Sequence, residues 1–208
     1  MKSPQQPPAE PVYADRAYRS LSALMGGVLL LALTAWIGGD AVFQGEGRAP
    51  WIGIAGLVML VPLIVAFTLR PAVFANDDRI RIRNPFRTIT VPWAAVARVR
   101  AGYTSEVVTQ EGAKYQLWAV PVSLRQRKIA ARRQAKAARD EARGRGSDSA
   151  ADSPVAPGDR TIAELRELAE QGASRPSAKG EPQVRWAYEV IGPVVVGAIA
   201  LVVLLAVG

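Results

Sequence analysis

Three long apolar blocks and one alternating region divide the chain. The blocks cover residues 21–42, 51–69 and 186–208, and each has about the 20 residues that a helix needs to cross the hydrocarbon layer of a membrane. Only residues 43–50 separate the first two blocks, which therefore predict a transmembrane helical hairpin. The third block predicts a C-terminal transmembrane helix.

Two other interpretations fit the apolar blocks less well. The first block follows Lys2, Arg16 and Arg19 and could be a cleaved signal peptide, but it is long for such a segment, lacks a small-residue cleavage pattern and precedes a second apolar block. The blocks could also be buried helices of a soluble protein, but they have no polar face. Membrane spans are therefore the favoured prediction.

Basic residues near the block ends predict an orientation. Three precede the first block, one lies in the short connection, and residues 70–87 carry five. Because basic residues are retained on the cytoplasmic side, we expect a multi-pass protein of the cell membrane whose N-terminus, residues 1–20, is cytoplasmic. This segment is also Pro-rich and is expected to be disordered. Residues 70–185 are then also cytoplasmic, and the C-terminus is external.

Residues 72–120 alternate between apolar and polar positions, as strands do. In residues 79–83, three arginines share one face and two isoleucines share the other, which is the pattern of a half-buried strand. About six short strands follow from this pattern. They need a second layer, so we expect a small antiparallel barrel or sandwich that packs against a helix. The residues expected in its core are Ile80, Ile82, Ile89, Val91, Trp93 and Leu117.

Two helices of different character are predicted after the strands. Residues 121–144 are rich in strong helix formers and in basic residues, but they offer few apolar side chains besides Leu124 and Ile129. Residues 146–185 form a polar linker, interrupted by a short amphipathic helix at residues 161–171 that begins with a capping box. This second helix could dock on the β-domain or bind a partner helix.

Composition and motifs argue against an enzyme. The chain has no cysteine and no histidine, which excludes disulfides, thiolate nucleophiles, imidazole bases and the usual zinc ligands. Asp77 and Asp78 are adjacent in a turn, so their carboxylates point apart rather than forming a catalytic pair. No Gly-rich phosphate loop occurs, and no charge lies near the middle of an apolar block. We therefore expect no catalytic, cofactor-binding or metal site.

The stretch DDRIRIRNPFRTITVPWAAVARV, residues 77–99, resembles the membrane-anchored bacterial pleckstrin-homology-like (PH-like) domain proteins of the actinobacterial type. The resemblance implies an α+β membrane protein, with a PH-like domain and its basic C-terminal helix at residues 71–145. A complete domain of this kind usually has seven strands, one more than the pattern shows. The residues that carry the resemblance are Asp78, Arg83, Asn84, Arg87, Pro92, Trp93, Val96 and Val99.

Basic side chains supply the candidate binding surface. The resemblance implies a module that binds anionic lipid headgroups or a protein or peptide partner. The net charge of +8 suits an anionic ligand. Each basic residue near an anionic leaflet contributes on the order of 1 kcal/mol of favourable binding free energy. Nucleic-acid binding by residues 125–145 is the alternative, although no aromatic side chains are interleaved there for base stacking. A solvated strand face is the simpler interpretation for the arginines of residues 79–83. The candidate residues are Arg79, Arg81, Arg83, Arg87, Arg125, Arg127, Lys128, Arg132 and Arg133.

Overall fold

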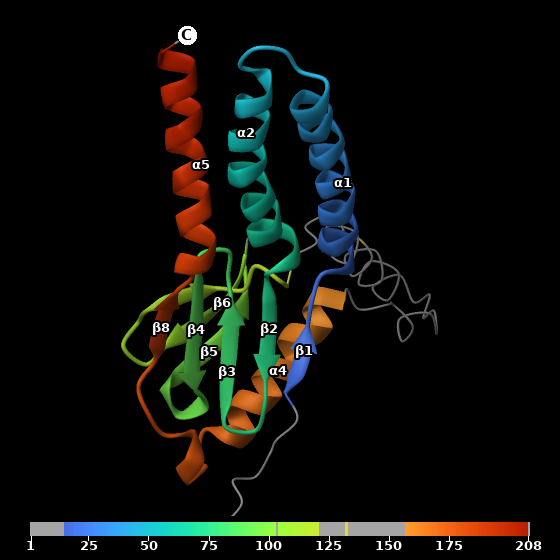
Figure 1. Ribbon diagram of the computed structural model, residues 1–208. Helices are drawn as coiled ribbons and strands as arrows, with labels where there is room; N and C mark the ends of the chain where they lie inside the picture. Colours follow the sequence, from blue (N-terminus) through green and yellow to red (C-terminus); the bar gives the residue numbers. More distant parts are fainter. Residues whose placement is uncertain (1–14, 103, 121–131, 133–156, 208) are drawn as a thin grey trace, which may run out of the picture.

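The computed structural model describes residues 15–102, 104–120, 132 and 157–207. Most of the predicted basic helix, the first part of the predicted linker and most of the predicted disordered N-terminus lie outside these residues. The described elements form an α+β chain, as predicted, in which three helices rise from one end of a β-domain (Figure 1).

Three helices are long and apolar enough to cross a membrane. α1 (Leu21–Phe43) and α2 (Ala49–Ile64) form the predicted hairpin, and α2 continues as a π-helical turn (Val65–Leu69). The third helix is α5 (Tyr188–Ala206), which begins after the predicted start at Trp186 because that residue belongs to a strand. α2 lies between α1 and α5 (Figure 1).

Polar contacts join α2 and α5 at both ends of the helix pair. At the end next to the β-domain, the Arg70 guanidinium forms an ion pair of 3.0 Å with Glu189. At the opposite end, Arg48 Nη2 donates to the Val207 carbonyl at 3.1 Å. Between them, Gly197 lies so close to α2 that a Cβ would stand 2.6 Å from the Met59 nitrogen. Small residues at such a contact allow the two backbones to approach closely.

Two antiparallel sheets form the β-domain. In the described part of the chain they do not close into a barrel, so of the two predicted forms only a two-layered arrangement remains. The first sheet consists, in spatial order, of β1 (Arg16–Tyr18), β2 (Ala72–Ala75), β3 (Arg79–Arg83), β4 (Arg87–Pro92) and β8 (Gln183–Trp186). The second consists of β5 (Val96–Ala101), β6 (Ser105–Thr109) and β7 (Lys114–Gln116).

The two edge strands of the first sheet correct the sequence prediction. β1 lies in a segment predicted to be disordered, yet it pairs with β2. β8 lies where a linker and the start of a span were expected, yet it pairs with β4. Each strand has only three or four residues, so its own pattern gives a weak signal that the apolar block beside it conceals. Both lead almost directly into a long helix, so the sheet sets where α1 and α5 begin.

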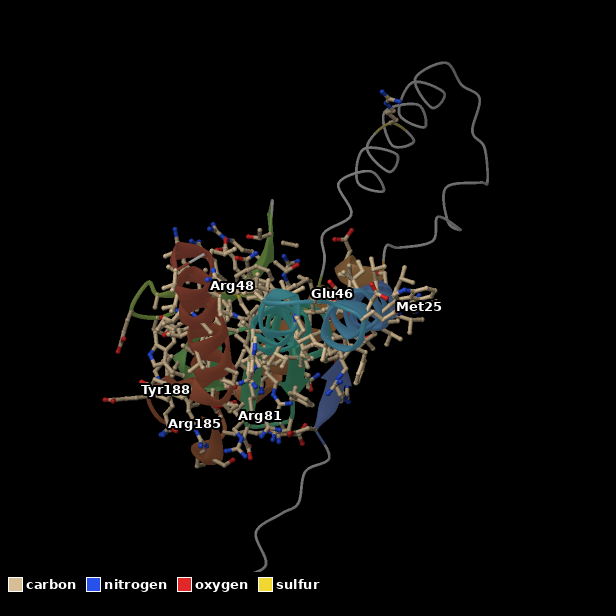
Figure 2. All side chains as sticks on the ribbon, turned by 45° about the horizontal axis from the view of Figure 1, so that its top comes forward. Met25, Glu46, Arg48, Arg81, Arg185 and Tyr188 are labelled. Atoms are coloured by element: carbon tan, nitrogen blue, oxygen red, sulfur yellow. The ribbon has the colours of Figure 1, made fainter. Side chains whose placement is uncertain are left out.

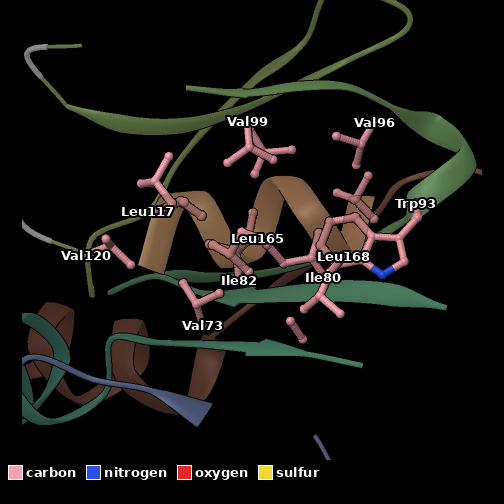
Figure 3. Packing of buried hydrophobic residues seen from close by; sticks show 14 of the residues in the cluster. Val73, Ile80, Ile82, Trp93, Val96, Val99, Leu117, Val120, Leu165 and Leu168 are labelled. Carbon is pink, nitrogen blue, oxygen red and sulfur yellow. The ribbon is translucent and has the colours of Figure 1, made fainter. Parts of the chain in front are cut away.

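The helix α4 (Pro157–Gly172) completes the core between the sheets. It contains the predicted amphipathic segment, and its Ile162, Leu165 and Leu168 are buried in the same cluster as residues of both sheets. Figure 3 shows Leu165 and Leu168 in this core. Of the two options for this segment, docking on the β-domain is the one that the structure shows. The predicted core residues Ile80, Ile82, Ile89, Val91, Trp93 and Leu117 are all buried in the same cluster.

A hydrogen bond ties β1 to α4. The Tyr18 hydroxyl donates to Glu164 Oε2 at 3.0 Å. Burial, and then the hydrogen bond and negative charge of Glu164, raise the pKa of Tyr18 above its ordinary value of 10.0. The neutral phenol is therefore favoured in the folded state, and the unfolded chain loses this proton first as the pH rises.

Tyr18→Phe is expected to lower the free energy of unfolding by about 1 kcal/mol at neutral pH, the usual net contribution of one hydrogen bond. The stabilisation by Tyr18 is complete below the ordinary tyrosine pKa and declines above about pH 10. Thermal unfolding of the full chain in detergent at neutral and alkaline pH measures both effects. The prediction fails if parent and variant differ by the same amount at both pH values.

Candidate anion-binding site

Arginines cover the outer face of the first sheet. Alternation along β3 buries Ile80 and Ile82 and leaves Arg79, Arg81 and Arg83 on the opposite face. β8 contributes a further arginine to that face, Arg185, which was not among the predicted site residues. These four residues, Arg79, Arg81, Arg83 and Arg185, are called the outer arginine face below.

Strand register brings two of these arginines to either side of a threonine. Arg83 lies opposite Thr88 of β4, and Thr88 lies opposite Arg185 of β8. Residues directly opposite each other point to the same side of a sheet. Because neighbouring strands are about 4.8 Å apart, the two arginine Cα atoms lie about 10 Å apart with a hydroxyl between them. Arg83, Thr88 and Arg185, the basic row, thus combine two guanidinium groups with a hydroxyl, donors that suit phosphate oxygens.

Phe74 supports the arginines of β3. The guanidinium carbon of Arg81 lies 4.9 Å from the centre of the Phe74 ring, and that of Arg83 lies 5.5 Å from it. Arg81 also forms an ion pair of 2.6 Å with Asp15. Among the described residues, Arg79, Arg83 and Arg185 have no ion-pair partner within 4.0 Å. Within the described residues, the basic row therefore contains two arginines whose charge no ion pair compensates.

Burial and nearby positive charges both disfavour the charged form of Arg83. Burial, and then the neighbouring charges of Arg70, Arg81 and Arg19, lower the pKa of Arg83 below its usual value, and Glu189 only partly opposes this. The group stays protonated at physiological pH because an arginine pKa is so high. A lowered pKa means that more negative charge nearby would stabilise the cation. A bound anion would supply that charge.

The basic row lies at the end of the sheet nearest the apolar helices. Arg83 is paired with Ala72, three residues beyond the end of the π-helical turn of α2, and Arg185 lies three residues before the start of α5. Arg79 lies at the opposite end of β3, about 13 Å away at the usual strand rise. Figure 2 shows Arg81 and Arg185 on the same side of the molecule as Tyr188, the first residue of α5.

Of the other predicted site residues, the structure separates Arg87 from this face. Arg87 has the same alternation as the buried Ile89 and Val91, so it lies on the inner side of β4 opposite Trp186. Arg132 is exposed. The predicted residues Arg125, Arg127, Lys128 and Arg133 lie outside the described residues.

Arg185 could have been found from the sequence. In residues 183–186, Gln and Arg alternate with Val and Trp, which is a strand pattern. Its position beside Arg83 could not have been found in this way, because it depends on the pairing of β8 with β4.

Asp77 and Asp78, the adjacent carboxylates for which the sequence argued against a catalytic pair, make structural contacts. Asp77 forms an ion pair of 3.0 Å with Arg175, and Asp78 Oδ1 accepts a hydrogen bond of 2.7 Å from Ser177. Both contacts attach the segment after α4 to the turn before β3. Over the residues that the structure describes, no group of three or more metal-ligating side chains occurs.

Comparison with protein families agrees with this architecture. Residues 70–145 match the family model described as a bacterial PH domain. The chain therefore contains a PH-like domain, as its sequence suggested. Searches of curated proteins and of solved structures found no match. β1, α4 and β8 lie outside the matched residues, yet they complete the sheet and the core of the PH-like domain.

Proposed function

We propose that this chain is a non-enzymatic, multi-pass protein of the cell membrane whose cytoplasmic PH-like domain binds anionic lipid headgroups through the basic row. The observation that carries this proposal is the cross-strand alignment of Arg83, Thr88 and Arg185 at the helix end of the sheet. If α2 and α5 cross the membrane, this end of the sheet faces the lipid surface.

Charge and distance support a lipid ligand. Arg83 and Arg185 have no ion-pair partner among the described residues, and Arg70 and Arg19 add positive potential around Arg83. The attraction of a basic residue to an anionic leaflet decays within a Debye length, about 8 Å at physiological ionic strength. Residues at this end of the sheet therefore contribute most, whereas Arg79 at the far end contributes little.

The distribution of basic residues along the chain also favours this arrangement. All five arginines of residues 70–87 belong to the PH-like domain or to its junction with α2. Basic segments next to a span are retained in the cytoplasm, where the leaflet is rich in anionic lipids. The nucleic-acid alternative relies on residues 125–145, of which only Arg132 is described, so the site geometry supports the lipid proposal alone.

The double variant Arg83→Gln/Arg185→Gln is expected to lose affinity for phosphatidylglycerol by on the order of tenfold or more, because two contacts of about 1 kcal/mol each are removed. Native mass spectrometry of the full chain in detergent, titrated with phosphatidylglycerol and with phosphatidylcholine, measures the bound lipids. The loss should shrink as salt is raised, since screening weakens the contacts in the parent protein.

A matched control removes the same charge from the far end of the domain. Arg79→Gln/Lys179→Gln has the same net charge as the first variant, and both of its residues are exposed. It should retain nearly the affinity of the parent. Equal losses in both variants would show that only net charge matters, and no loss in either would show that the arginines form a solvated face. Binding of duplex DNA in parallel would favour the nucleic-acid alternative.

A further inference from the structure

Aromatic side chains lie where the PH-like domain meets α2 and α5. Phe67, in the π-helical turn of α2, makes edge contacts with Phe86 at 5.4 Å and with Trp118 at 5.5 Å between ring centroids. Phe86 packs against a small cluster of Ala66, Ala187 and Val190 from α2 and α5. Phe86, in the turn between β3 and β4, thus packs between the ends of α2 and α5 nearest the β-domain. Trp118 contacts Phe67 at the same junction.

Trp118 remains exposed although its neighbours are buried. Leu117, Ala119 and Val120 all lie in the core, whereas 45% of Trp118 is exposed. A backbone hydrogen bond from Val120 to the Leu117 carbonyl closes the turn around it. Because the residues on both sides are fixed in the core, the indole is held outward rather than being free to fold back.

Two further exposed rings continue the same band. Trp186 at the end of β8 is 50% exposed, and Tyr188 at the start of α5 is 72% exposed. The Ala187 nitrogen between them donates to the Phe86 carbonyl at 2.9 Å, so both rings are anchored next to Phe86. The backbone bond thus places Trp186 and Tyr188 at the same end of the domain as Phe86, whose ring contacts Phe67, which in turn contacts Trp118.

Such a band suits the boundary between lipid and water. Tryptophan and tyrosine combine an apolar ring with a polar group and are enriched at the headgroup level of membrane proteins. Exposing several large rings to water is unfavourable, whereas Phe67 and Tyr188 belong to helices that are long and apolar enough to cross a membrane. If those helices cross a membrane, their ends place these rings at its surface.

We propose that Trp118, Trp186 and Tyr188, supported by Phe67 and Phe86, form an aromatic collar that inserts into the headgroup layer. The collar fixes the depth and tilt of the PH-like domain, and so holds the basic row against the lipid surface. It requires that α2 and α5 cross the membrane, but it does not require anionic lipid or the arginines.

The natural lack of cysteine allows a direct test. Trp118→Cys in the full chain is spin-labelled and reconstituted into vesicles of phosphatidylcholine alone. The label is expected to collide severalfold more with oxygen, which partitions into lipid, than with a water-soluble nickel complex. Lys114→Cys is the control, since Lys114 is exposed on β7 and lies about 13 Å along the chain from Trp118 at the usual strand rise. Its label should collide mainly with the nickel complex.

Two outcomes would overturn the collar. A label at residue 118 as accessible to nickel as the control would place it in water, and a label shielded from both reagents would place it against protein. A second measurement keeps an aromatic ring at residue 118. The parent and Trp118→Phe are each placed in vesicles of brominated phosphatidylcholine, which quenches tryptophan in contact with lipid. The variant should have a smaller share of its tryptophan fluorescence quenched. An unchanged share would also contradict the proposal. Since no anionic lipid is present, failure here leaves the headgroup proposal intact.

Discussion

Trp93→Ala is expected to lower the free energy of unfolding of the PH-like domain by about 3–5 kcal/mol, the usual cost of removing a large aromatic side chain from a core. Trp93 is fully buried, with 0% exposed, and its Nε1 donates to the Asn76 carbonyl at 2.7 Å. Gly172 at the end of α4 lies so close that a Cβ there would stand 2.4 Å from Trp93 Cδ1. The indole therefore joins the turn before β3 to the end of α4.

Thermal unfolding of the full chain in detergent measures this effect. For a domain of this size, a loss of 3–5 kcal/mol corresponds to a decrease in Tm of more than about 10 °C. Trp93→Phe should have a smaller effect, because it keeps most of the ring volume. It still loses the hydrogen bond to the Asn76 carbonyl. Trp36→Ala is the control, since Trp36 is exposed on α1 and does not contact the core. A decrease as small as that of the control would show that Trp93 is not a core residue.

Leu165→Ala is expected to destabilise the domain by about 2–5 kcal/mol, since it leaves a cavity between α4 and the two sheets. Leu165 is fully buried, and its neighbours Ile162 and Leu168 belong to the same core. Arg166 adds a second contact, because its Nε donates to the Val99 carbonyl of β5 at 2.8 Å. The helix thus covers the core and also satisfies an edge carbonyl of the second sheet.

The control for this prediction lies on the same helix. Glu170→Ala changes an exposed residue of α4 and improves helix propensity, so it should leave Tm within a few degrees of the parent. Increased proteolysis of Leu165→Ala at temperatures where the parent resists cleavage would show the same loss independently. If Leu165→Ala and Glu170→Ala unfold at the same temperature, α4 does not contribute to the core as the structure indicates.

The attachment of the domain to the helices bears on the proposed function. β1 lies two residues before α1, α2 leads into β2, and β8 lies one residue before α5. Short connections of this kind leave little freedom for rotation between sheet and helices. The Arg70–Glu189 ion pair and the Phe86 cluster add contacts at the same level. The proposed basic row and the proposed aromatic collar therefore belong to one junction, whose position is set by α1, α2 and α5.

The sequence by itself determined the elements that have a strong local pattern. Apolar runs of about 20 residues predict the three long helices, and the alternation around Ile80 and Ile82 predicts β3 and the arginines on its outer side. The amphipathic stripe of α4 was also visible, although its partner was not. In each case the pattern needed only neighbouring residues, because burial of one face repeats at a fixed period along a strand or helix.

Only the tertiary structure decided which distant segments meet. β1 and β8 are held by backbone hydrogen bonds to β2 and β4, and such bonds leave almost no trace in side-chain composition. The pairing of β8 with β4 aligns Arg185 with Thr88 and hence with Arg83. Arg87, which was grouped with these arginines in the sequence prediction, lies on the inner side because it alternates in phase with Ile89 and Val91. Local periodicity specifies the face of a residue, but strand register specifies its neighbours.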